Sequence, residues 1–202
     1  MVPINLKCWR SQLRQFHYSL KQTGKYDRVN QKKKEFGGAV NMKFRSTLIA
    51  VKDMGISKQF YHDVLGLNVV ADFGANVTLD GGVVLQTLDT WKSFIRMDSV
   101  SLPNNAGELY FEENDMDTFC NHLKTFDICY VHELFEHRWG QRVIRFYDPD
   151  KHIIEVGEKL DAVVLRFIEQ GLSAEETAVR MDVPLDFVQS CLNKESNSTL
   201  SN

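Results

Sequence analysis

The stretch "GQRVIRFYDPDKHIIEVGE", residues 140–158, contains two alternating runs joined by a short polar segment. Apolar and polar side chains alternate in each run as in a β-strand, and Asp148-Pro149-Asp150 between them is a typical turn sequence. The stretch therefore predicts two antiparallel strands. Successive strand residues point to opposite faces, so Glu155 shares a face with Ile153 and not with Ile154. One face of this sheet must accommodate a buried or half-buried charge.

The two strands belong to a longer pattern that occurs twice. The pattern is a strand, a helix and three further strands, because alternating runs and an amphipathic run follow one another in that order. In the first copy the ranges are 44–51, 53–66, 67–73, 75–80 and 82–88, and in the second they are 107–113, 114–126, 127–134, 141–148 and 152–158. Residues 90–107 between the copies are polar and contain Pro103, which predicts a loop. Such an internal repeat of the βαβββ order predicts an α+β fold.

Each copy alone would leave one face of its sheet bare, so the two sheets are expected to pair around a shared cleft. Gly66 is expected to end the first helix as its C-cap, and Asn114 or Asp115 to cap the second helix at its start. We therefore treat residues 42–158 as one duplicated domain.

Residues 1–41 differ in charge from the rest of the chain. They hold nine Lys and Arg against two acidic residues, so they carry +7, and the remaining residues carry −10 of the whole-chain charge of −3. This composition favours a disordered basic extension over a nucleic-acid or membrane tether. Gly37-Gly38 precedes Met42, and we hypothesise that the natural protein begins at Met42. The acidic body argues against a nucleic-acid-binding surface there.

Residues 159–202 predict three short helices and a polar tail. Gly171 ends the first helix, Ser173 and Glu176 form a capping box for the second, and Pro184 opens the third. The arrangement resembles a helix-turn-helix, but residues 184–194 carry a single basic side chain to meet phosphate. A helical lid or a dimerisation element is therefore favoured over DNA binding.

Cysteine spacing and hydropathy indicate the compartment. The four cysteines form no CxxC pair, no apolar run approaches the ~20 residues of a membrane span, and no secretory signal is visible. We expect a cytoplasmic protein.

The segments "FYHDVLGLNVV" (60–70) and "RFYDPDKHIIEV" (145–156), with the repeated βαβββ order, resemble the vicinal oxygen chelate superfamily. This superfamily includes glyoxalase I, extradiol dioxygenases, fosfomycin-resistance enzymes and bleomycin-binding proteins. The resemblance covers about residues 43–158. It implies a glyoxalase-like half-open barrel, here with a C-terminal helical appendage.

The resemblance also implies where metal ligands would stand, on the first and last strand of each module. These positions are Ser46, Gln86, Glu108 and Glu155. Serine is a poor ligand, so the expected metal set is Gln86, Glu108 and Glu155, with either carboxylate as the group that moves a proton. An all-oxygen set suits Mg²⁺ or Mn²⁺ better than Zn²⁺, although Ni²⁺ and Zn²⁺ also belong to the family's range, and no organic cofactor is implied.

The histidines usual in such sites are missing at these positions, so a second interpretation stays open. In it Glu108 and Glu155 are neutralised by arginines, since a buried carboxylate needs a partner. The available arginines on neighbouring strands are Arg45, Arg142 and Arg145.

Several other residues are candidates for the lining of the cleft. His132 and His137 could be further ligands, a general base or exposed loop residues. Trp139 and Arg142 could bind an aromatic or anionic substrate, or pack at the end of the barrel. Ser46 completes this set.

Three functions of different classes follow. The first is a metal-dependent lyase or isomerase acting on a small oxygen-rich substrate. The second is a non-catalytic binding protein that sequesters a small molecule, as bleomycin-resistance proteins do. The third is a ligand-sensing regulator that touches DNA through its tail. A small-molecule ligand and a homodimer are the expected partners.

Overall fold

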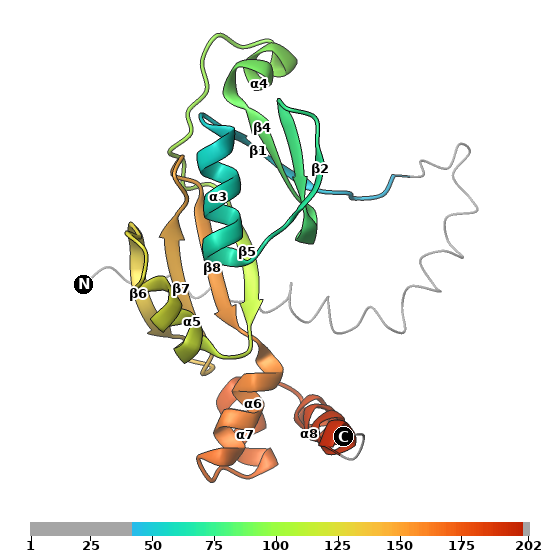
Figure 1. Cartoon of the computed structure of the whole chain (residues 1–202). Helices are drawn as coiled ribbons and strands as arrows, with labels where there is room; N and C mark the ends of the chain where they lie inside the picture. The colour runs from blue at the N-terminus through green and yellow to red at the C-terminus, as the bar shows by residue number, and fades with distance from the viewer. Residues whose placement is uncertain (1–41, 200–202) are drawn as a thin grey trace. The chain divides into compact units, whose positions relative to one another are not determined.

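The computed structural model describes residues 42–199, with side chains to residue 195 (Figure 1). The chain divides into two units, Met1–Arg45 and Ser46–Asn202. The expected basic extension, residues 1–41, lies outside the described residues. Residues 42–45 of the first unit are exposed and have no regular secondary structure. The helices and strands described below all belong to the second unit.

The first module forms a four-stranded mixed sheet, here called the first sheet, with strand order β1-β4-β3-β2. Its strands are β1 (Thr47–Val51), β2 (Val69–Asp72), β3 (Asn76–Leu79) and β4 (Val83–Thr87), and its helix is α3 (Met54–Leu65). Strands β1 and β4 pair in parallel, whereas β2, β3 and β4 pair antiparallel. A short 3-10 helix, η2 (Asp80–Gly82), turns the chain between β3 and β4.

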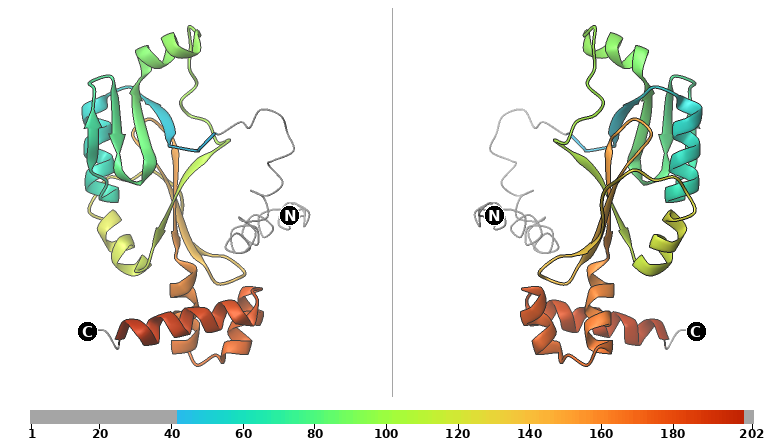
Figure 2. Two further views of the ribbon diagram at one scale, coloured as in Figure 1. Left: turned by 90° about the vertical axis from the view of Figure 1, so that its right-hand side faces the viewer. Right: turned by 90° about the vertical axis from the view of Figure 1, so that its left-hand side faces the viewer.

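The second module repeats this order in a second sheet, β5-β8-β7-β6. Its elements are β5 (Glu108–Glu113), α5 (Met116–Leu123), β6 (Tyr130–Glu136), β7 (Arg142–Tyr147) and β8 (Ile153–Glu158). Strands β5 and β8 are parallel, as β1 and β4 are in the first sheet. The two sheets are not closed into a barrel, and the duplicated α+β architecture predicted from the sequence is confirmed (Figure 2).

One hydrophobic core serves both modules. It takes side chains from α3, α5 and one face of each sheet, including the fully buried Tyr61, Leu85 and Phe146. The hydroxyl of Tyr61 donates a hydrogen bond of 3.0 Å to Asp148, the first residue of the Asp-Pro-Asp turn. The turn therefore joins the modules as well as the strands.

Each sheet thus has a core face and an outer face. On β8, Ile154 and Val156 belong to the core, so Glu155 points to the outer face, on the side opposite Ile154 as the alternation predicted. Cross-strand register places Tyr110, Glu155, Arg145 and His132 in one row across the outer face of the second sheet.

Most helix ends follow the local sequence. Asp53 caps α3 and Gly66 ends it in the left-handed region, Asp115 caps α5, and the predicted capping box of Ser173 and Glu176 is present. One prediction was wrong: the polar connection contains a helix, α4 (Leu88–Ile95).

The three C-terminal helices are α6 (Leu160–Glu169), α7 (Ala174–Met181) and α8 (Leu185–Thr199). They share a separate hydrophobic cluster built around Val164, Phe167 and Val188. Over residues 42–199, no helix combines the length and apolar character needed to cross a bilayer.

Candidate functional site

Arg145 lies between the two carboxylates that the sequence selected. Its Nε donates a hydrogen bond of 2.8 Å to Glu108, and its Nη2 forms an ion pair with Glu155. The two glutamates come from the parallel strands β5 and β8, and Arg145 comes from β7 directly opposite Glu155. The guanidinium thus neutralises part of a charge that would be costly alone, because the side chain of Glu155 is only 8% exposed.

The third nitrogen of the guanidinium contacts His132. Nη1 of Arg145 lies 3.2 Å from Nε2 of His132, and Nδ1 of His132 lies 2.8 Å from the carbonyl oxygen of Glu133. Arginine can only donate, so these contacts fit the tautomer that carries its proton on Nδ1. His132 therefore connects Arg145 to the backbone of β6.

The carboxylates of this face differ in exposure. Oε2 of Glu155 is buried against the guanidinium of Arg145, so Arg145 is the partner of this oxygen. Glu108 and Glu112, on the same face of β5, are exposed. They are therefore the carboxylates that a ligand could reach.

An aromatic side chain covers the neighbouring part of the outer face. Tyr110 lies across β8 at Gly157, where a Cβ would stand 3.0 Å from its ring. Gln141 fixes the hydroxyl of Tyr110 by donating a hydrogen bond of 3.2 Å, and its amide oxygen accepts one of 3.1 Å from Nε1 of Trp139. Tyr110 and Trp139 are thereby connected through one buried amide.

The turn between β6 and β7 presents a pair of stacked rings. His137 and Trp139 lie with their ring centroids 4.1 Å apart and their planes 12° apart. Burial, and then the positive charge of Arg145, lower the pKa of His137 below its usual value. A lowered pKa favours the neutral imidazole, which can accept a proton as a general base.

Gln86 lies on the first sheet, and its side-chain amide is fully used. It accepts a hydrogen bond of 2.7 Å from Asn76 and donates to the carbonyl oxygen of Ala75 at 2.9 Å and to the hydroxyl of Thr90. The residue is 1% exposed. Ser46, just before β1, is half-buried. No contact brings either residue to Glu108 or Glu155 within the described part of the chain.

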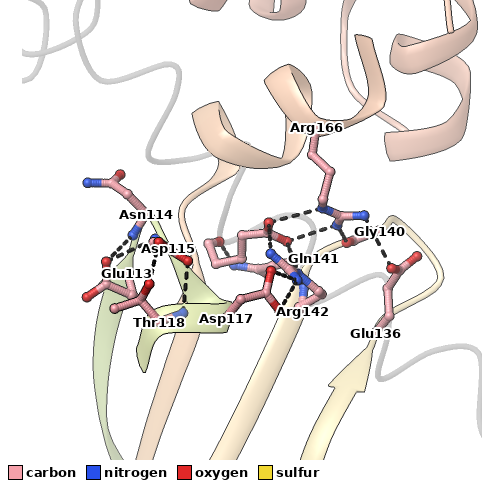
Figure 3. Close-up of polar contacts among 11 residues, drawn as sticks. Glu113, Asn114, Asp115, Asp117, Thr118, Glu136, Gly140, Gln141, Arg142 and Arg166 are labelled. Carbon is pink, nitrogen blue, oxygen red and sulfur yellow. Dashed lines mark hydrogen bonds and ion pairs between the residues drawn. The ribbon is translucent and has the colours of Figure 1, made fainter. Parts of the chain in front are cut away.

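Arg142 lies on the core face of the second sheet, at the end of the sheet next to α6 (Figure 3). It forms ion pairs with Glu158 at 2.9 Å and with Asp117 of α5 at 3.1 Å. Arg166 of α6 contacts the same glutamate at 2.9 Å. Glu158 is 1% exposed, so two arginines enclose one buried carboxylate.

A divalent ion does not fit the groups that these residues offer. Among residues 42–195, no group of three or more His, Cys, Asp or Glu side chains could hold a metal. The two carboxylates of the expected set are paired with Arg145, and the amide of Gln86 is buried and hydrogen-bonded to Asn76, Ala75 and Thr90. A cation placed between the glutamates would have to displace a guanidinium of like charge.

Comparison with known proteins identifies the family. Residues 44–161, more than half of the chain, match the model of the glyoxalase-like domain. The chain therefore belongs to the glyoxalase-like family of the vicinal oxygen chelate superfamily, as the motifs indicated. No curated protein matches the chain.

Solved structures agree on the fold. A protein of unknown function from Agrobacterium tumefaciens is 37% identical, with a TM-score of 0.55, and the match covers 62% of this chain and 98% of that one. A glyoxalase-related enzyme from Fulvimarina pelagi is 16% identical, with a TM-score of 0.52, covering 59% and 90%. A hypothetical protein from S. aureus is 20% identical, also with a TM-score of 0.52, covering 59% and 95%. The last two show the fold alone.

Proposed function

We propose that this protein binds a small organic ligand on the outer face of its second sheet and needs no resident metal to do so. The observation that carries the proposal is the position of Arg145, which stands between Glu108 and Glu155 where a metal-dependent member would hold its ion. This favours the sequestering, drug-binding class over the metal-dependent lyase or isomerase.

The charge of the face indicates the class of ligand. Around Tyr110, three carboxylates face one guanidinium, and every guanidinium nitrogen already has a partner. The carboxylates are those of Glu108, Glu112 and Glu155. An anionic ligand would meet net repulsion from these carboxylates, whereas an ammonium group could pair with the exposed carboxylates of Glu108 and Glu112. The aromatic faces of Tyr110 and Trp139 would attract the same cation and its apolar part.

Titration with matched probes tests the proposal. Benzylamine, benzyl alcohol and benzoate share a ring and differ in charge, so calorimetric titration compares the charge alone. We expect benzylamine to bind most tightly, and Glu112→Gln to weaken it by about two- to fivefold, because an exposed ion pair contributes at most about 1 kcal/mol. Asp89→Asn on α4, whose side chain is 97% exposed, is the matched control and should leave binding unchanged.

Two results would count against the proposal. Equal affinity for benzyl alcohol would show that the carboxylates play no part. Stoichiometric binding of Mn²⁺ that is lost in both Glu108→Gln and Glu155→Gln would instead support the metal-dependent class.

We also propose a homodimer. Apolar side chains outside the ligand contacts remain exposed on the outer sides of both sheets, including Leu48 at 36% and Phe135 at 53%. Association of two copies would remove such area from water. Sedimentation equilibrium gives the mass directly, and a monomer at all concentrations would refute this part.

A further inference from the structure

The C-terminal helices contact the turn that carries the stacked rings. The carbonyl oxygens of Arg138 and Gly140 accept hydrogen bonds from Arg180 and Arg166 respectively. The same two arginines reach Glu136, just before the turn, at 3.1 and 3.4 Å. Cations from α6 and α7 therefore hold both ends of the turn. Figure 3 shows the contacts that Arg166 makes with Gly140 and Glu136.

An aromatic contact adds to these bonds. Gly140 has a φ of 91°, and a Cβ there would come within 2.2 Å of the ring of Phe167 on α6. The guanidinium carbons of Arg166 and Arg180 lie 5.0 and 5.3 Å from the centroid of that ring. The turn is thus packed against Phe167 as closely as a glycine permits.

Inside the turn, two backbone hydrogen bonds add to the ring stacking and to the hydrogen bond from Trp139 to Gln141. Its own backbone bonds are those from the Gly140 amide to His137 and from the His137 amide to Gln141, both 2.8 Å. Two such bonds allow a short loop to open locally at low free-energy cost. Contacts from α6 and α7 raise that cost.

The residues that make these contacts lie beyond the family domain. The glyoxalase-like match ends at residue 161, whereas Arg166, Phe167 and Arg180 follow it. The solved relative from Agrobacterium is matched over 98% of its own length by 62% of this chain. The positioning contacts are thus supplied by a part of the chain outside the shared domain.

We infer that α6 and α7 are a positioning element for the ligand face: through Arg166, Phe167 and Arg180 they fix the turn that presents His137 and Trp139. The effect of this element on ligand binding rests on the proposed function. Gln141 hydrogen-bonds to both Trp139 and Tyr110, so the position of the turn is linked to the ligand face. Release of the turn would move the ring pair without altering Glu108, Arg145 or Glu155.

Arg180→Met tests the inference on the full chain, because Arg180 is 40% exposed and its loss leaves the buried Glu158 paired. Hydrogen exchange should accelerate about tenfold or more at the amides of His137 and Gly140, as expected for loss of a charged hydrogen bond. The pKa of His137, followed by NMR, should rise towards its ordinary value as the ring becomes solvated. Affinity for benzylamine should fall.

Lys194→Met is the matched control. Lys194 is a cation of α8, and it pairs with Asp161 of α6. Its replacement should therefore change neither hydrogen exchange in the turn nor the pKa of His137. Gly140→Ala is a second variant, which keeps all arginines but displaces Phe167 and should reproduce both changes. The inference is overturned if Arg180→Met and Gly140→Ala both leave exchange and the His137 pKa at wild-type values. The proposed function fails separately, if the wild-type protein does not bind benzylamine.

Discussion

Replacing Glu158 by glutamine should be among the most destabilising single changes that keep the side-chain shape. The carboxylate is 1% exposed and receives hydrogen bonds from Arg142 at 2.9 and 3.2 Å and from Arg166 at 2.9 and 3.1 Å. Removing the charge of this buried group leaves Arg142 and Arg166 with only their more exposed partners, Asp117 and Glu136, which costs up to about 3–5 kcal/mol. For a chain of this size that lowers the melting temperature by about 6–20 °C.

Thermal and urea unfolding measure the effect, and a neighbouring residue provides the control. Glu136 contacts Arg166 and Arg180 but is 39% exposed, so Glu136→Gln should cost less than about 1 kcal/mol. If the two variants proved equally stable, the enclosed carboxylate would not be a structural centre and the reasoning would be refuted.

The pH dependence of stability provides a second readout for the same residue. Burial by itself raises the pKa of Glu158, but the hydrogen bonds from Arg142 and Arg166 outweigh it and hold the pKa below its ordinary value of 4.5. A carboxyl group whose pKa is lower in the folded state contributes stability above about pH 4.5, and this contribution is lost as the pH falls through the folded pKa. The difference in unfolding free energy between wild type and Glu158→Gln should therefore shrink below pH 4.5, and a constant difference down to pH 2.5 would contradict this.

Three further variants or reactions test other parts of the structure. Tyr61→Phe removes the hydroxyl that binds the buried carboxylate of the Asp-Pro-Asp turn, and should cost about 1.5–3 kcal/mol in urea unfolding; no loss would mean that this bond does not join the modules. Gly140→Ala combines a positive φ with the contact to the α6 ring and should cost about 2–5 kcal/mol, whereas Gly107→Ala, with no atom within 4 Å, should be nearly neutral. Burial and then a nearby carboxylate raise the pKa of Cys191 to about 11, so at pH 8 alkylation of the native protein should label the exposed Cys129 and leave Cys191 intact; equal labelling would contradict that burial.

Local patterns in the sequence were sufficient for most of the fold. Alternation located the strands, and caps such as Gly66 and Ser173 located helix ends, because these signals act within a few residues. The helix α4 was not predicted, since its N-cap Thr87 makes no capping bond and none of its residues is buried. A helix without a capping hydrogen bond or a buried face leaves only a weak signal in the local sequence.

The candidate site was predictable only in part. Strand alternation separated Glu155 from Ile154 and Val156. Its partner depends on which residue of β7 lies opposite, so the sequence left Arg45, Arg142 and Arg145 as possible partners. The register selects Arg145, and Arg142 turns to the other face. The sequence also drew attention away from Glu158, which is the more buried carboxylate. Its position on the core side, in phase with Ile154 and Val156, was the available signal.

The saturation of Gln86 was not visible in the sequence at all. Its amide is used by Asn76, by a backbone carbonyl and by Thr90 of the unpredicted helix α4. Hydrogen-bond partners of this kind have no fixed spacing in the sequence. Only the structure shows that the amide of Gln86 is already hydrogen-bonded.

A crystal structure of the full chain grown with excess Mn²⁺ and benzylamine, recorded at the manganese edge, would show which cation this face binds. We expect Arg145 to remain between Glu108 and Glu155, the amine nitrogen to lie beside the carboxylates of Glu108 and Glu112, and this face to give no anomalous peak. An anomalous peak bound by both Glu108 and Glu155, with Arg145 displaced, would contradict this expectation.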